Sequence, residues 1–142
     1  MGAILKRLDF KQRYPGFNQG LFLVQSEKRL PKDQPVVNIG RTVSSQLINY
    51  PQEKRAGETL QIVRDSISAS NAVSLVHIDV LFTDYLAFDV VRELLSLARN
   101  RKLCVLWPGE CRDGTLKYAE PGSREYYECN LQGLNDTYYV CE

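Results

Sequence analysis

Several features that mark common classes of functional site are missing from this sequence of 142 residues. It has one histidine, no C-x-x-C pair among its four cysteines and no Gly-Lys dipeptide at any of its nine glycines. Without paired ligand spacing the cysteines predict no metal site, and reduced thiols are favoured over a disulfide framework. Without Gly-Lys the usual phosphate-binding loop, G-x-x-x-x-G-K-S/T, is absent too. The sequence therefore predicts no metal and no resident cofactor.

Strong charge bias and long apolar runs are absent as well. Eighteen Lys and Arg residues against seventeen Asp and Glu leave a net charge of +1. No global field therefore attracts the protein to nucleic acid or to an anionic membrane, and such binding would need a local patch. Nowhere do about eighteen apolar residues run together, and the N-terminus lacks an apolar segment followed by a cleavage site. We expect a cytoplasmic protein with no membrane partner.

What the sequence does contain is a strand–helix–strand pattern in its second half. A short apolar run rich in β-branched residues covers 73–81, and apolar residues recur every four positions from Leu86 to Ala98. A second apolar run at 103–106 ends at Pro108-Gly109. These periods predict a strand buried on both faces, an amphipathic helix, and a second strand parallel to the first.

The other segments extend this pattern into a single α/β domain spanning 1–142, with its core over 17–130. Further strands are predicted at 20–24, 35–39 and 137–141, and further helices at 43–50, with Thr42 as its N-cap, and at 57–69. Residues 1–16 indicate a helical extension whose apolar face carries Ile4, Leu5 and Leu8. The turn at 112–115 contains Asp-Gly and predicts a hairpin. The expected fold is a three-layer, P-loop-like, mostly parallel sheet with an antiparallel edge hairpin.

Candidate nucleotide chemistry lies where the predicted strands end. A strand ending near Asp79 suggests a P-loop-like fold, in which such a carboxylate holds Mg²⁺ through water. The nearest mimic of a phosphate loop, Gly40-Arg41-Thr42, has Arg in place of Lys. Residues 25–34 are also too few for a phosphate loop with its crossover helix. The sequence thus favours no catalytic residue, while Asp79 for catalysis and Gly40, Arg41 and Thr42 for ATP with Mg²⁺ stay as alternatives.

Two other groups of titratable residues favour structural roles. His77 falls within the predicted strand 73–81, and no Ser, Cys or Asp forms a recognisable nucleophile motif with it. Asp84 and Asp89 flank the start of the predicted helix, where carboxylates complement the helix dipole. We therefore favour a structural histidine and helix-stabilising carboxylates over acid–base catalysis.

A basic cluster and a tryptophan are the candidates for contact with a partner. Arg99, Arg101 and Lys102 end the predicted helix, where cations stabilise any helix. They could also neutralise phosphates or reach the nucleotide of a neighbouring subunit. Trp107 precedes a rigid turn, a position suited to a pocket or a protein interface, with core packing equally open. These four residues are the predicted contacts with a partner protein or nucleic acid.

Several short motifs occur in an order and spacing that resemble one family. They are Asn38 with 44–47, then 78–82, 89–91, 98–101, 106–109, 118–122, and Glu125-Tyr126. Over roughly residues 35–128 the chain is similar to the small P-loop subunit of BREX phage-defence systems, the F component called BrxF. The resemblance implies a cytoplasmic, ATPase-like fold in a multi-subunit bacterial complex that distinguishes self from phage DNA.

The sequence departs from this family at the nucleotide site. The phosphate-binding motif and most of its helix are missing, and the best register puts Val76, not Asp79, at the position of the Mg²⁺-linked aspartate. We therefore expect a non-hydrolysing subunit with degenerate Walker motifs that assembles with other subunits of a defence complex. An active ATPase with an atypical phosphate site, a nucleic-acid-binding accessory module, self-association and DNA contact through the complex stay open.

Overall fold

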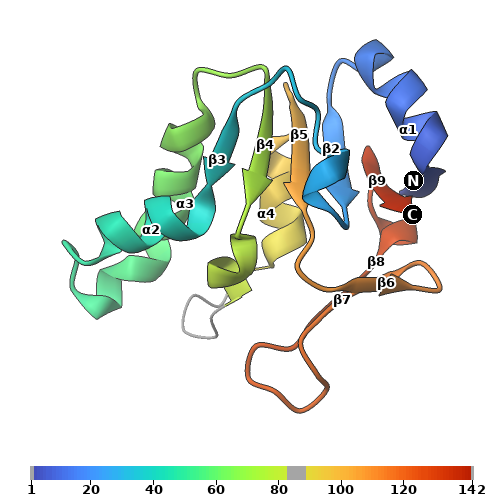
Figure 1. The fold of residues 1–142 in the computed structure, drawn as a ribbon. Helices are drawn as coiled ribbons and strands as arrows, with labels where there is room; N and C mark the ends of the chain where they lie inside the picture. Colours follow the sequence, from blue (N-terminus) through green and yellow to red (C-terminus); the bar gives the residue numbers. More distant parts are fainter. Residues whose placement is uncertain (1, 83–88, 142) are drawn as a thin grey trace.

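The computed structural model describes residues 2–82 and 89–141, which form two sheets. The larger sheet has six parallel strands in the order β1-β9-β2-β5-β4-β3, and the smaller has three antiparallel strands in the order β6-β7-β8 (Figure 1). The strands of the larger sheet are β1 (Ala3–Lys6), β2 (Gly20–Val24), β3 (Val36–Asn38), β4 (Ala72–Val76), β5 (Lys102–Leu106) and β9 (Thr137–Cys141). The mixed α/β fold with a mostly parallel sheet is confirmed.

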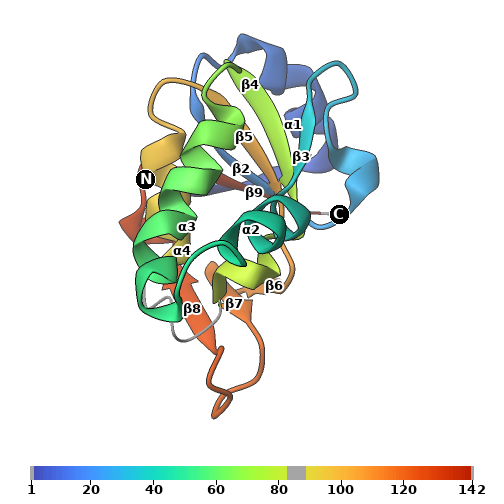
Figure 2. The ribbon, with the colours of Figure 1, turned by 90° about the vertical axis from the view of Figure 1, so that its left-hand side faces the viewer.

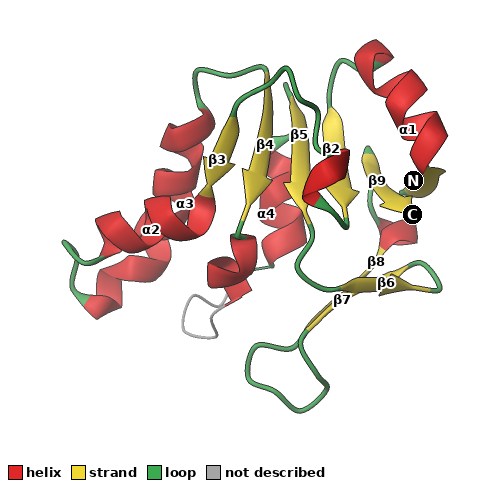
Figure 3. Ribbon diagram, viewed as in Figure 1, coloured by secondary structure: helices red, strands yellow, loops and turns green. Residues whose placement is uncertain are grey.

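Helices lie on both faces of the larger sheet. They are α1 (Arg7–Arg13), α2 (Ile39–Leu47), α3 (Gln52–Ile67) and α4 (Val90–Leu97). Figure 2 shows α3 and α4 on one face and α1 on the opposite face. Short 3₁₀ helices at Tyr14–Gly16, Glu27–Arg29, Ile78–Phe82 and Leu131–Gly133 complete the connections, and Figure 3 separates helices from strands by colour.

Alternate residues of β2 enter two separate cores. In β2, Leu21 and Leu23 pack with the residues of α2, α3 and α4, whereas Phe22 and Val24 pack with Phe10 of α1. All five residues of β2 are buried, as the apolar run predicts for a strand covered on both faces. The strand–helix–strand prediction is confirmed too, because β4 and β5 pair in parallel and α4 connects them.

The strand that was predicted over 73–81 ends at Val76. His77 adopts a left-handed backbone conformation with φ of 57°, and the chain continues as the 3₁₀ helix Ile78–Phe82. Ile78, Leu81 and Phe82 are still buried, so the apolar run persists after the strand has ended. The placement of His77 inside a strand is therefore wrong, and its side chain is exposed.

Two helices begin earlier than their patterns predict. Helix α2 starts at Ile39, because the Oδ1 atom of Asn38 accepts a hydrogen bond from the backbone N–H of Arg41 at 3.0 Å. Asn38, not Thr42, is the N-cap. Helix α3 starts at Gln52, directly after Pro51, instead of at residue 57. For α4 the prediction holds in part: Asp89 is its N-cap, whereas Leu86 and Asp84 lie outside the described residues.

The N-terminal residues form a strand before they form a helix. Strand β1 pairs with β9 along its full length, and only Leu5 of its four residues is buried. Ile4 and Leu8 are 53% and 64% exposed, so they are not the buried face of an opening helix. The two-residue alternation of a strand directs neighbouring side chains to opposite faces, which separates Ile4 from Leu5.

The predicted hairpin exists, but it does not edge the larger sheet. Strands β6 (Glu110–Arg112) and β7 (Thr115–Tyr118) pair with each other, and β7 pairs with β8 (Tyr127–Asn130), a strand whose polar sequence gave no signal. The turn at 107–109 leads the chain below the larger sheet (Figure 1). A β-carbon at Gly109 would overlap the carbonyl group of Lys117, so only glycine fits this crossing.

We predict that Gly109→Ala lowers the free energy of unfolding by about 1–3 kcal/mol, because the added methyl group would lie 2.8 Å from the carbonyl carbon of Lys117. The matched control is Gly57→Ala in α3, where nothing lies within 4 Å of the added β-carbon. In a helix interior this control should stabilise by about 0.5–1 kcal/mol. Urea denaturation measures both changes. Equal effects of the two substitutions would contradict the close crossing at Gly109.

Candidate functional site

The carboxyl ends of the parallel strands, where ligands bind in sheets of this kind, are covered by the chain itself. Four aromatic residues join the smaller sheet to the larger one. The ring of Phe82 stacks on Tyr118 at 4.1 Å between centroids and meets Trp107 edge-on at 5.6 Å and Tyr127 at 5.4 Å. We call these four residues the aromatic junction.

Trp107 is buried within this junction, with 2% of its surface exposed. Its indole Nε1–H donates to the carbonyl oxygens of Glu110 and Lys117 at 3.2 and 3.3 Å. Its backbone N–H donates to the carbonyl oxygen of Val24 at 2.8 Å. Trp107 therefore packs in the core of the chain itself, as the core-packing alternative predicts.

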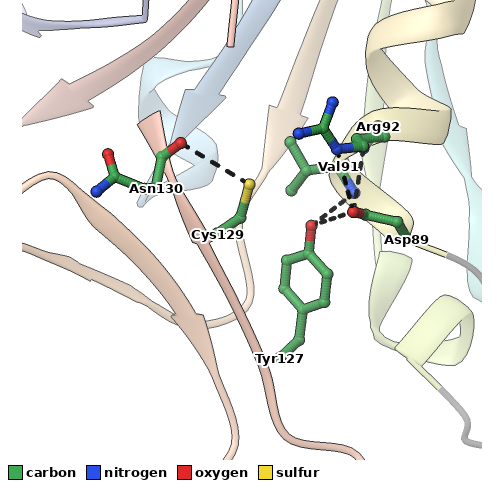
Figure 4. Close-up of polar contacts among 6 residues, drawn as sticks. All are labelled: Asp89, Val91, Arg92, Tyr127, Cys129 and Asn130. Atoms are coloured by element: carbon green, nitrogen blue, oxygen red, sulfur yellow. Dashed lines mark hydrogen bonds and ion pairs between the residues drawn. The ribbon is translucent and has the colours of Figure 1, made fainter. Parts of the chain in front are cut away.

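A polar contact holds the junction against the start of α4 (Figure 4). The hydroxyl of Tyr127 donates to the carboxylate of Asp89 and accepts a hydrogen bond from the backbone N–H of Val91 at 3.3 Å. Asp89 also accepts from the backbone N–H of Arg92 and pairs with its guanidinium, both at 3.4 Å. Burial, and then the hydrogen bond to Asp89, raise the pKa of Tyr127. The predicted helix-stabilising role of Asp89 is confirmed, and the side chain also fixes Tyr127 and Arg92.

Burial also raises the pKa of two thiols in the smaller sheet. Cys111 and Cys129 both lie opposite Leu116 in the register of β7, on the two strands that flank it. Burial raises the pKa of each thiol, which leaves both neutral and weakly nucleophilic. All four cysteines are free, as the sequence predicts.

The alternative nucleotide site does not form a loop. Gly40, Arg41 and Thr42 lie in the first turn of α2, which follows β3 without an intervening residue. A β-carbon at Gly40 would come within 3.2 Å of the carbonyl oxygen of His77. Close packing against the end of β4 therefore explains this glycine.

Asp79 is exposed in the 3₁₀ helix that follows β4. Burial raises the pKa of Tyr118, and the negative charge of Asp79 adds to this shift, so the two side chains are near each other. Among the described residues, no group of three or more His, Cys, Asp or Glu side chains could hold a metal ion.

The three basic residues that follow α4 share no partner among the described residues. Arg101 donates from Nη1 to the carbonyl oxygen of Ile67, at the end of α3, at 2.6 Å. Lys102 donates from Nζ to the carbonyl oxygen of Tyr14 at 3.3 Å and lies 4.3 Å from the centroid of its ring. Only Arg99 is exposed. The structure therefore does not bring them together as one basic patch.

A partly buried chain of hydrogen bonds lies on the face of the sheet that carries α1, and the sequence pattern did not reveal it. The hydroxyl of Tyr14 donates to Oε1 of Gln34 at 2.8 Å, and Nε2 of Gln34 donates to the hydroxyl of Ser74 at 3.0 Å. Ser74 is fully buried in β4. The one available signal was a serine inside an otherwise apolar strand, because a buried hydroxyl requires a partner.

Two cavities open at the surface. One, of about 350 Å³, lies along α4 and has six polar lining residues: Gln19, Arg92, Ser96, Arg99, Asn135 and Asp136. The other, of about 320 Å³, lies on the smaller sheet between Glu110, Lys117 and the loop that follows β7. Neither is lined by Gly40, Arg41, Thr42 or Asp79. We call the first cavity the α4 groove.

No protein-family model, curated protein or solved structure matches this chain. In the described part of the chain, every helix is too short or too polar to cross a membrane.

We predict that Tyr127→Phe lowers the free energy of unfolding at neutral pH by about 1–3 kcal/mol, because it leaves the Val91 N–H and the Asp89 carboxylate without their hydroxyl partner. The raised pKa of Tyr127 makes the cost depend on pH. Up to the ordinary value of 10.0 the phenol is neutral in the folded and unfolded chain, and its contribution is fully present. At higher pH the unfolded chain loses this proton first, so the wild type loses stability.

The difference between wild type and Tyr127→Phe should therefore shrink by up to about 1.4 kcal/mol per pH unit as the pH rises through this range. Urea denaturation at several alkaline pH values measures it. Tyr126→Phe is the control, because in the described part of the chain the hydroxyl of Tyr126 bonds the exposed carboxylate of Glu128. A difference that stays constant with pH would contradict the assigned contact.

Proposed function

We propose that this protein is a non-hydrolysing, P-loop-like subunit of a bacterial BREX-type antiphage defence complex, and that it acts through protein–protein assembly. Other subunits of such a complex are its partners, and the cytoplasm is its place of action. The proposal combines the family resemblance of residues 35–128 with the packing of the region where a nucleotide would bind.

The connection between β2 and β3 is the observation that carries this proposal. In a P-loop protein this connection would hold a phosphate loop and a helix. Here the connection contains only the 3₁₀ helix Glu27–Arg29, and Leu30 packs into the core beside α1. Gln34 at its end is bonded to Tyr14 and Ser74. Side chains of the chain itself thus fill the face on which a phosphate-loop helix would pack.

The smaller sheet supports the same proposal. It lies below the carboxyl ends of the larger sheet (Figure 1), and the aromatic junction fixes it there. Several residues that carry the family resemblance, namely Asp89, Trp107, Gly109 and Tyr118, belong to this region. The motifs that resemble the family therefore lie where the two sheets join. This placement suits a subunit that acts by assembling with other proteins.

Two alternatives fit the packing less well. An active ATPase would need a phosphate site at Gly40, Arg41 and Thr42, but the backbone N–H of Arg41 is already used by the cap of α2. A nucleic-acid-binding module would need a continuous basic surface, but Arg101 and Lys102 are bonded to separate parts of the chain.

We predict that isothermal titration with ATP and Mg²⁺ detects no binding, because the phosphate cradle is replaced by packed side chains. A micromolar affinity would contradict the proposal. If phosphate is nevertheless released from ATP, Asp79→Ala and Arg41→Ala separate the alternatives. Loss of phosphate release in both variants would support an atypical ATPase. Unchanged phosphate release would show that neither residue belongs to such a site.

A further inference from the structure

Two arginine side chains line the α4 groove. Arg92 and Ser96 lie four residues apart on α4 and so share a face of the helix, and Arg99 follows in the turn after its last residue, Leu97. The opposite wall comes from segments that precede β2 and β9, namely Gln19 and 135–136.

The two arginines differ in how the protein holds their guanidinium groups. The guanidinium of Arg92 is held from one side by Asp89, which is in turn held by the hydroxyl of Tyr127. This contact orients Arg92 while leaving 64% of its side chain exposed. Arg99 is exposed, and no hydrogen bond or ion pair holds it within residues 2–82 and 89–141. The groove is thus lined by the guanidinium of Arg92, which Asp89 orients, and by that of Arg99, which no described residue holds.

We infer that the α4 groove binds a carboxylate-bearing segment of a partner protein, an inference that rests on the proposed assembly function. Guanidinium groups recognise carboxylates through paired hydrogen bonds. Gln19 and Ser96 add polar atoms suited to the backbone of such a segment.

The same groove is a poor track for a nucleic-acid backbone. A phosphate chain requires a run of cations, and its binding strength follows the number that it contacts. Here Asp136 places a carboxylate in the groove, and the carbonyl end of α4 adds partial negative charge near Arg99. The neighbouring cations Arg101 and Lys102 are bonded to Ile67 and Tyr14. A few carboxylates fit this mixture of charges better than a continuous phosphate chain does.

The experiment is fluorescence anisotropy with three labelled probes: hexaglutamate, hexaglutamine and hexathymidylate. We expect hexaglutamate to bind and hexaglutamine not to bind. Arg99→Glu should weaken hexaglutamate binding by about tenfold or more, because an attractive charge becomes a repulsive one. The matched control is Arg112→Glu on β6, an arginine with 70% exposure and an ion pair of its own to Glu110 at 3.7 Å. This control should leave binding unchanged. An unchanged thermal midpoint shows that each variant is folded.

Absent hexaglutamate binding, or an equal loss in both variants, would overturn the inference. Hexathymidylate binding that exceeds hexaglutamate binding and depends on Arg99 would overturn it in favour of nucleic acid. Titration of the same protein with ATP and Mg²⁺ separates this failure from that of the proposed function. Nucleotide binding would contradict the proposed non-hydrolysing subunit. Absence of both peptide binding and nucleotide binding would contradict only the role assigned to the α4 groove.

Discussion

The architecture depends on one buried hydroxyl. Ser74 is fully buried in β4, and a buried hydroxyl without a partner costs about 1–3 kcal/mol. Gln34 supplies the partner, and Tyr14 in turn fixes the amide of Gln34. Three segments far apart in the sequence are thereby joined: the end of the α1 region, the connection between β2 and β3, and the inner strand β4. This chain of contacts holds the connection against the sheet, where a nucleotide-binding protein would need a mobile loop and a helix.

A second set of contacts fills the space at the carboxyl ends of the strands. The aromatic junction holds the smaller sheet below the larger one, and Tyr127 links it to the start of α4 through Asp89. The carboxyl ends of the strands, where an α/β sheet of this kind usually binds a ligand, are thus filled by the protein's own side chains. The proposed assembly function, with the α4 groove as a contact, rests on this packing.

The sequence predicted those parts of the fold that depend on local apolar pattern. Strand β2 is a continuous apolar run, and such runs in parallel sheets are recognisable without tertiary information. The same signal misled at 78–82, because a 3₁₀ helix with buried residues produces an apolar run just as a strand does. Strand β8 alternates half-buried Tyr127 and Cys129 with exposed Glu128 and Asn130, but this alternation covers only four residues and gives a weak signal. Among the candidate contact residues, Arg101 and Lys102 were assigned to a surface, but their partners Ile67 and Tyr14 lie 34 and 88 residues away. Contacts of this range are decided by the fold.

The central claim is that the connection between β2 and β3 is a closed structural element that no nucleotide opens or orders. Hydrogen–deuterium exchange of the backbone amides of residues 25–34 tests this claim most directly, because a phosphate loop would gain protection on binding its ligand. The account predicts the same exchange rates in these amides with and without saturating ATP and Mg²⁺. Exchange that slows in this segment when ATP and Mg²⁺ are added would contradict it.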